Sequence, residues 1–218
     1  MITRIKNVLL LTIGEFIHIL REKRQIRISN KYHDVLNNGE RVLGCELNLN
    51  TKTHKERYLF ATKFISNNDT VLDYACGAGY GCHTIAKSYK KASITGFDIS
   101  EKAIQYANTH FKKSNITFTT HEPRNKFNII IAFEFLEHIN DMQDMFKHLL
   151  HLTINKFIFS VPYREKQSNN PHHKHFNLNE KSFILPENSD IYYQNKYGQI
   201  SKELDEKDRQ NMILSIIK

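Results

Sequence analysis

Two glutamates and a histidine lie close together near the middle of the chain, directly after an apolar run. Glu134, Glu137 and His138 come directly after the apolar run of residues 127–133. On a helical turn the positions i, i+3 and i+4 share one face, so the three side chains could act together. They could bind a divalent ion such as Mg²⁺, Mn²⁺ or Zn²⁺, or His138 could be a general base without a metal. In a third interpretation, Glu137 and His138 are a structural pair at a helix start.

A second chemical signal is a cluster of glycines in a chain that has only 8 of them. Gly77, Gly79 and Gly81 follow an apolar run, and glycine lets a ligand approach the backbone closely. The G-x-G-x-x-G pattern of dinucleotide-binding loops is absent, because Cys82 occupies the position of its last glycine. Asp73 would repel a pyrophosphate but attract a ligand that carries an ammonium and a sulfonium group. The loop therefore indicates a cationic nucleoside rather than NAD.

An aspartate at the end of the next apolar run supports this interpretation. Asp98 lies 21 residues beyond Gly77 and ends the run 93–98. In a sheet of parallel strands, an acidic side chain at this place accepts hydrogen bonds from the ribose hydroxyls of a nucleoside. A single aspartate at a strand end can instead cap a turn or a helix, but the spacing from the glycine loop favours ribose binding.

Apolar runs that alternate with helical patterns must position these residues. The runs predict strands at 70–74, 93–98, 116–119, 127–133 and 156–161, with helices near 82–90, 100–111 and 141–150. This alternation is typical of an α/β protein, here a doubly wound αβα sandwich whose ligands bind beyond the carboxyl ends of the strands. After about residue 162 the pattern is less regular, with strands expected at 190–194 and 199–201.

Length and cysteine content indicate one cytoplasmic domain. The 218 residues, 40% of them hydrophobic, suit a single large domain, which we place at residues 51–218 after a lead-in of residues 1–50. The three cysteines form no CxxC pair and leave an odd count. This usage favours a reducing compartment, and hence the cytoplasm, over a disulfide scaffold.

Most of the formal charge of +8 lies near the amino terminus, where residues 1–31 carry seven basic and two acidic side chains. Apolar residues recur there at helical spacing, so we expect a basic amphipathic helix as an N-terminal extension. It could lie on an anionic membrane surface, or it could pack on the domain or a partner and present its lysines to water. Its unbroken apolar run, residues 8–11, is too short to span a membrane. A nucleic-acid partner is not expected, because no basic groove studded with aromatic residues accompanies this helix.

Three motifs occur in a fixed order: VLDYACGAGYG at residues 71–81, GFDIS at 96–100 and FEFLEHI at 133–139. They resemble the successive motifs of class I S-adenosylmethionine-dependent methyltransferases, with a Rossmann-like fold and S-adenosylmethionine as cofactor. HKERY at 54–58 and NPHHKHF at 170–176 also resemble a bacterial branch that is often linked to surface-polysaccharide biosynthesis. The resemblance covers residues 54–176; it is specific for the cofactor and uninformative about the acceptor.

The resemblance implies a role for each motif residue. The methionine part of the cofactor would contact Asp73, Ala75, Gly77 and Gly79. The ribose and adenine would contact Asp98 and Ile99, and the sulfonium would lie near Phe133 and Glu134. Tyr58 of the upstream motif would be a further cofactor contact.

The cluster after the third motif resembles that of metal-assisted hydroxyl methyltransferases acting on quinone precursors or small-RNA ends. In those enzymes a downstream histidine completes the site, which here would be His173 or His175. We expect the metal ligands, if a metal is bound, to be Glu134, Glu137, His138 and His175. Without a metal, His138 and Glu137 are the expected catalytic residues.

We therefore expect an enzyme that O-methylates a hydroxyl of a sugar or a sugar-linked intermediate at the cytoplasmic face of a bacterial membrane. Two alternatives stay open. One is a methyltransferase that acts on an RNA terminus or a small aromatic metabolite. The other is a non-catalytic binding module that keeps the fold, although the presence of the glycines and both aspartates argues against a lost cofactor site.

Overall fold

The computed structural model describes Leu20, Lys23, Arg27 and residues 31–36, 41–44, 49–167 and 170–217. Most of the predicted basic helix of residues 1–31 and most of the lead-in to residue 50 lie outside these described residues. Among the described residues, no helix has the length and apolar character needed to cross a membrane.

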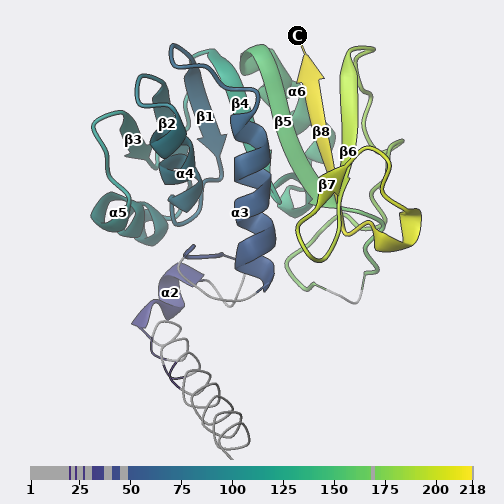
Figure 1. Ribbon diagram of the computed structural model, residues 1–218, viewed down its shortest axis with the longest axis horizontal. Helices are drawn as coiled ribbons and strands as arrows, with labels where there is room; N and C mark the ends of the chain where they lie inside the picture. Colours follow the sequence, from purple (N-terminus) through teal and green to yellow (C-terminus); the bar gives the residue numbers. More distant parts are fainter. Residues whose placement is uncertain are drawn as a thin grey trace, which may run out of the picture.

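One mixed sheet forms the centre of the molecule, with the strand order β3-β2-β1-β4-β5-β8-β6-β7 (Figure 1). Five strands run parallel: β1 (Thr70–Tyr74), β2 (Ser93–Phe97), β3 (Ile116–Thr119), β4 (Phe127–Phe133) and β5 (Thr153–Pro162). Three antiparallel strands complete the sheet: β8 (Asn211–Ile217), β6 (Ser189–Gln194) and β7 (Ile200–Ser201). The order reverses between β1 and β4, which is where sheets of this kind bind ligands.

Helices cover both faces of the sheet, because the central strands are apolar on both sides. On one face lie α3 (Leu49–Thr62), α4 (Tyr80–Ser88) and α5 (Glu101–His110), packed on a core that includes Ile129 and Ile131 of β4. On the other face lies α6 (Met142–Leu152), packed on a core that includes Ile130 of the same strand. Each fully buried isoleucine of this kind contributes about 1.5–3 kcal/mol to stability.

The α/β sandwich predicted from the sequence is therefore confirmed. β1, β3 and β4 have the predicted bounds, and the other predicted helices and strands are shifted at their ends by one to three residues. Ser100 caps α5 as expected, since its hydroxyl accepts a hydrogen bond from the backbone N–H of Ala103 at 3.3 Å. α3 and β8 were not predicted from the sequence.

The segment after β5 is irregular only in part. Among the described residues, 163–188 form neither helix nor strand, as expected, but β8 then inserts between β5 and β6. Two single helical turns flank the cavity described below: η1 (Leu136–His138) and η2 (Glu206–Asp208).

A short piece of the lead-in packs on the domain. The helix α2 (His33–Leu36) lies against α5, where the Tyr32 ring meets that of Tyr106 edge-on at 4.8 Å between centroids. Val35 joins a small core cluster with Leu43. Residues 41–44 are thereby held beside the glycine turn that follows β1.

Candidate functional site

A cavity of about 1080 Å³ opens at the carboxyl ends of the parallel strands. It is at the large end of ligand-binding cavities, which suits two ligands side by side. Its walls come from residues 41–42, α3, the turns after β1, β2 and β4, and the segment after β5. Eight residues predicted from the sequence line it: Tyr58, Ala75, Gly77, Asp98, Ile99, Phe133, Glu134 and His138.

The turn after β1 exposes its backbone to this cavity. Gly77 has φ of 54°, and a Cβ placed there would meet nothing closer than the Arg41 side chain at 4.0 Å. Gly79 has φ of 85°, but a Cβ there would lie 2.6 Å from Ala107. Gly77 thus leaves room for a ligand, whereas Gly79 lets the turn pack on α5.

Asp98 is fastened beside this turn. Its carboxylate accepts hydrogen bonds from the backbone N–H groups of Gly77 and Ser100, both at 2.9 Å. Arg41 forms an ion pair with the same carboxylate at 3.3 Å. Ile99, the next residue, is apolar but 80% exposed, which offers a surface for a flat base beside Asp98, the residue predicted to bind the ribose. These residues fit the nucleoside part of S-adenosylmethionine.

Asp73 lies below the cavity rather than on its wall. The carboxylate is fully buried and accepts hydrogen bonds from Tyr58 Oη at 3.1 Å and Cys82 Sγ at 3.3 Å. Burial raises its pKa to about 7, although both hydrogen bonds favour the ionised form. The Tyr58 ring lies between Asp73 and the cavity. Glycine at position 81 makes room for this ring, because a Cβ there would lie 2.1 Å from it.

Glu134 lies at the junction of three strands. It has φ of 50°, a conformation that few residues other than glycine adopt. Its carboxylate accepts hydrogen bonds from Ser160 Oγ of β5 at 2.6 Å and from Asn211 Nδ2 of β8 at 2.7 Å. These two donors hold Glu134 at the cavity floor.

Glu137 is fully buried on η1, and neither of its carboxylate oxygens has a hydrogen-bond partner among the described residues. Burial raises its pKa well above the usual value, and the nearby charge of Glu134 raises it further. Arg57, itself buried, opposes the shift. An unpartnered buried carboxylate of this kind calls for a proton or a cation.

Two histidines stand beside Glu137. The rings of His138 and His173 meet edge-on, with 4.7 Å between their centroids. Glu137, His138 and His173 each offer one ligand atom, and these three atoms lie within 4.8 Å of one another. His138 Nδ1 lies 3.2 Å from the carbonyl oxygen of His172. His173 contacts the Glu165 carboxylate through Nδ1 and Asn170 Nδ2 through Nε2 at 3.0 Å.

The proposed metal ligands are therefore brought together only in part. The group contains Glu137 and His138 with His173, not with His175, whose Nε2 lies 2.8 Å from the carbonyl oxygen of Ile139. Glu134 is occupied by Ser160 and Asn211, as described above. Three oxygen and nitrogen donors at this spacing could hold a divalent ion.

Several cavity residues were not predicted from the sequence. His54 lines the cavity, and burial, with the charge of Arg57, lowers its pKa well below the usual value. It belongs to the HKERY motif, in which only Tyr58 has a role predicted from the sequence. Arg41 and Glu165 gave no signal, because neither belongs to a regular pattern in the sequence.

Comparison with known proteins shows the family of this chain. The family profile described as "Methyltransferase domain" matches residues 65–208. A protein named as a ribosomal RNA large subunit methyltransferase of Methanocaldococcus jannaschii is 27% identical over 146 residues, which are 61% of this chain and 35% of that protein. A ubiquinone biosynthesis O-methyltransferase of Rhodopseudomonas palustris is 37% identical over 79 residues, 33% of this chain and 30% of that protein. The chain thus spans about a third of the length of these relatives.

The fold itself has solved counterparts. Magnesium protoporphyrin IX methyltransferase of Synechocystis PCC 6803 with bound S-adenosylhomocysteine superposes with a TM-score of 0.58 at 16% identity, covering 90% of this chain and 99% of that one. At this identity the likeness concerns the fold alone.

Proposed function

This chain belongs to the methyltransferase domain family, and we propose that it transfers the methyl group of S-adenosylmethionine to a hydroxyl of a sugar or sugar-linked intermediate. The observation that carries the proposal is a single cavity with two unlike ends. One end has Asp98, Ile99 and the open backbone of Gly77. The other has His138 and His173 on its lining, with the buried Glu137 within reach of both, and these are groups that can activate a hydroxyl.

At the first end, the protein binds and orients the donor. S-adenosylmethionine supplies a methyl group on a sulfonium, which is transferred by in-line displacement. Asp98 accepts hydrogen bonds from the ribose, and this requires its ion pair with Arg41 to loosen. The nearly buried rings of Tyr58 and Phe133, 5.1 Å apart, exclude water from the space near the sulfonium. Catalysis then depends mainly on alignment of donor and acceptor.

At the second end, His138 is the candidate general base. A carbonyl oxygen can only accept a hydrogen bond, so Nδ1 of His138 carries the hydrogen that points to His172. The lone pair is then on Nε2, where it can take the proton from an acceptor hydroxyl. His173, edge-on to this ring, restricts its rotation.

A divalent cation is the second mechanistic candidate. Its support is the unpartnered Glu137 carboxylate beside two imidazoles. Glu137, His138 and His173 would hold the ion, which would lower the pKa of a bound hydroxyl. Under this alternative the same residues are ligands, and His138 is not the base.

The test is a scan of nucleotide sugars and glycans with a methyl-labelled donor, repeated with His138→Ala. We expect the variant to lose about 10²–10⁴-fold in kcat, the contribution of a general base, with unchanged donor affinity in calorimetry. His121→Ala is the matched control, because this exposed histidine lies outside the cavity lining. Full activity in His138→Ala would remove that residue from the mechanism.

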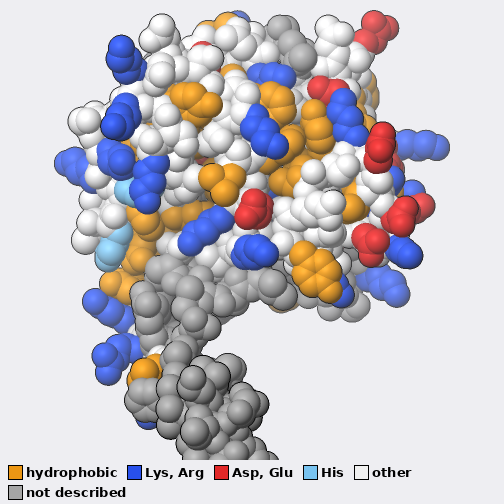
Figure 2. Space-filling model, viewed as in Figure 1, with side chains coloured by type: hydrophobic (Ala, Val, Ile, Leu, Met, Phe, Trp, Pro, Cys, Tyr) orange, Lys and Arg blue, Asp and Glu red, His pale blue; other side chains and the backbone are white. Residues whose placement is uncertain are grey.

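Metal content and donor binding separate the remaining alternatives. If a metal acts, tag-free protein contains it, a chelator abolishes turnover, and Glu137→Gln lowers the metal content. If S-adenosylmethionine gives no heat at high micromolar concentration, the non-catalytic module is correct instead. Salt-dependent binding of RNA would favour the RNA alternative. On the face in Figure 2, Lys and Arg side chains are scattered among other residues and form no continuous track.

A further inference from the structure

The acceptor end of the cavity is lined by more cations than its catalytic chemistry requires. Of the charged side chains on the lining, five are basic and three are acidic. Four of the basic residues come from the segment after β5 and from the chain that leads into β8. They are Arg164, Lys166, Lys174 and Arg209.

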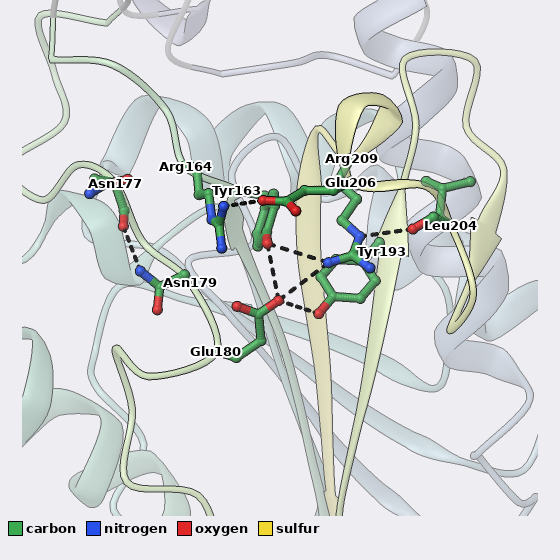
Figure 3. A network of polar contacts seen from close by, with 9 residues as sticks. All are labelled: Tyr163, Arg164, Asn177, Asn179, Glu180, Tyr193, Leu204, Glu206 and Arg209. Carbon is green, nitrogen blue, oxygen red and sulfur yellow. Dashed lines mark hydrogen bonds and ion pairs between the residues drawn. The ribbon is translucent and has the colours of Figure 1, made fainter.

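Arg209 is immobilised in a network of polar contacts (Figure 3). Its Nε donates to the carbonyl oxygen of Leu204 at 2.9 Å, and its Nη1 reaches Glu180 at 3.4 Å. The guanidinium lies over the Tyr193 ring, 3.6 Å from the centroid. Burial raises the pKa of Glu180, but hydrogen bonds from Tyr193 and Tyr163 lower it, and the pKa lies below its usual value. Glu180 is thus a fixed anion that orients Arg209.

A second guanidinium stands on the other side of the same network. Arg164 and Arg209 lie 5.1 and 5.5 Å from the centroid of the Tyr163 ring, and Arg164 also pairs with Glu206 (Figure 3). Each arginine is paired through Nη1, and no partner for either Nη2 is found among the described residues. Both line the cavity, so an anion there could accept hydrogen bonds from these groups.

The two lysines supply the unbalanced charge. Lys166 and Lys174 are exposed, and among the described residues neither ammonium group has an ion-pair partner. The backbone N–H of Lys174 donates to the carbonyl oxygen of Glu137 at 2.8 Å, which fixes this lysine next to the catalytic turn. The excess positive charge therefore borders the place where the acceptor hydroxyl must lie.

We propose that these four residues form a binding site for a phosphate group of the acceptor, so that the substrate is a sugar esterified with phosphate or diphosphate. This inference rests on the proposed function and makes its acceptor more specific. Two oriented guanidinium groups and two exposed ammonium groups match a multiply charged group with several acceptor oxygens. A ligand with a single carboxylate would need only the two arginines or only the two lysines.

The test is calorimetric titration of the full chain with inorganic pyrophosphate, inorganic phosphate and glucuronate. Each titration is run with and without saturating S-adenosylhomocysteine, which prevents the anion from occupying the glycine turn. We expect pyrophosphate to bind more tightly than glucuronate, and Lys166→Ala/Lys174→Ala to weaken pyrophosphate at least tenfold. The affinity for S-adenosylhomocysteine should stay within twofold.

Lys112→Ala/Lys126→Ala is the matched control, because both lysines are exposed and lie outside the cavity lining. Pyrophosphate binding that is no tighter than glucuronate binding, or equal in the two double variants, overturns the inference. S-adenosylhomocysteine binding in the same samples would then leave the proposed function intact. Sugar monophosphates and nucleotide diphosphate sugars, compared by kcat/KM, distinguish the two sources of the phosphate.

Discussion

Gly77 and Gly79 stand two residues apart, yet a side chain would have different effects at the two positions. Both have positive φ, so alanine costs about 1–2 kcal/mol at either one. At Gly79 a Cβ would also lie 2.6 Å from Ala107 and 2.8 Å from the Phe118 ring. We expect Gly79→Ala to lower the free energy of unfolding by about 2–5 kcal/mol in total.

At Gly77 the added methyl group points into open space, so the stability loss should stay near the backbone cost alone. Its main effect should be weaker binding of the donor. Urea unfolding and calorimetry with S-adenosylmethionine measure both quantities on both variants. Equal stability losses in the two variants would show that the turn packs differently.

The buried carboxylate of Asp73 should make stability depend on pH. Its pKa in the folded protein is about 7, above the ordinary value of 3.8, so the folded state binds this proton more tightly than the unfolded state does. The stability that this proton adds to the folded state is fully present below pH 3.8 and is lost as the pH rises through 7. The full loss amounts to about 4 kcal/mol.

Comparison with Asp73→Asn isolates this group, since the other titrations are common to both proteins. We expect the wild type to lose stability relative to the variant between pH 4 and 8, measured by denaturant unfolding without ligand. Parallel curves for the two proteins would mean that Asp73 is ionised at both ends of this range.

At the scale of elements, β8 connects the parallel half of the sheet to the antiparallel hairpin. It pairs with β5 on one side and β6 on the other, and Leu214 is fully buried. Leu214→Ala should therefore lower the free energy of unfolding by about 2–5 kcal/mol. Ile184→Ala is the control, because this side chain is 84% exposed and its loss should cost less than about 0.5 kcal/mol. A Leu214 variant as stable as this control would place β8 outside the cooperative core.

Sequence patterns predicted the parallel strands better than the elements around them. Strands buried on both faces have continuous apolar runs, as residues 129–133 of β4 do. α3 lacks a clean apolar stripe, because it buries Arg57 and exposes Leu59. β8 does have an apolar run, but its neighbours in the sheet are β5 and β6, which a local pattern does not reveal.

At the scale of the whole molecule, the basic amino-terminal segment leads into a part of the chain that contacts the donor site. α2 packs on α5, and Lys102 of α5 pairs with Asp34 of α2 at 2.5 Å. A few residues later, Arg41 pairs with Asp98. A partner that binds residues 1–31 would therefore lie close in sequence to Arg41, which contacts the carboxylate that we propose binds the ribose.

We propose that residues 1–31 attach the enzyme to an anionic membrane surface. The excess of five positive charges in this segment should give binding to vesicles that contain anionic lipid, decreasing as salt is raised. Co-sedimentation of the full chain measures this, and replacement of Arg21, Lys23 and Arg24 by glutamine should weaken it. Equal sedimentation with neutral vesicles, or no sedimentation at low salt, would favour packing on the domain or a partner.

The fold class, the glycine turn and the position of Asp98 could all be predicted from the amino-acid sequence. These features depend on neighbouring residues, since strand runs and a βα turn are read from contiguous patterns. The same local information grouped Glu137 with His138, which lie on one turn.

Which side chains contact these residues depends on the folded chain as a whole. The tertiary structure selected His173 over His175, because the backbone N–H groups of Lys174 and His175 both bond the Glu137 carbonyl and direct the two histidines differently. It also placed Asp73 beneath Tyr58 and brought Arg41 to Asp98. Such contacts join segments far apart in the chain through irregular loops, whose side-chain directions follow no period that a sequence could reveal.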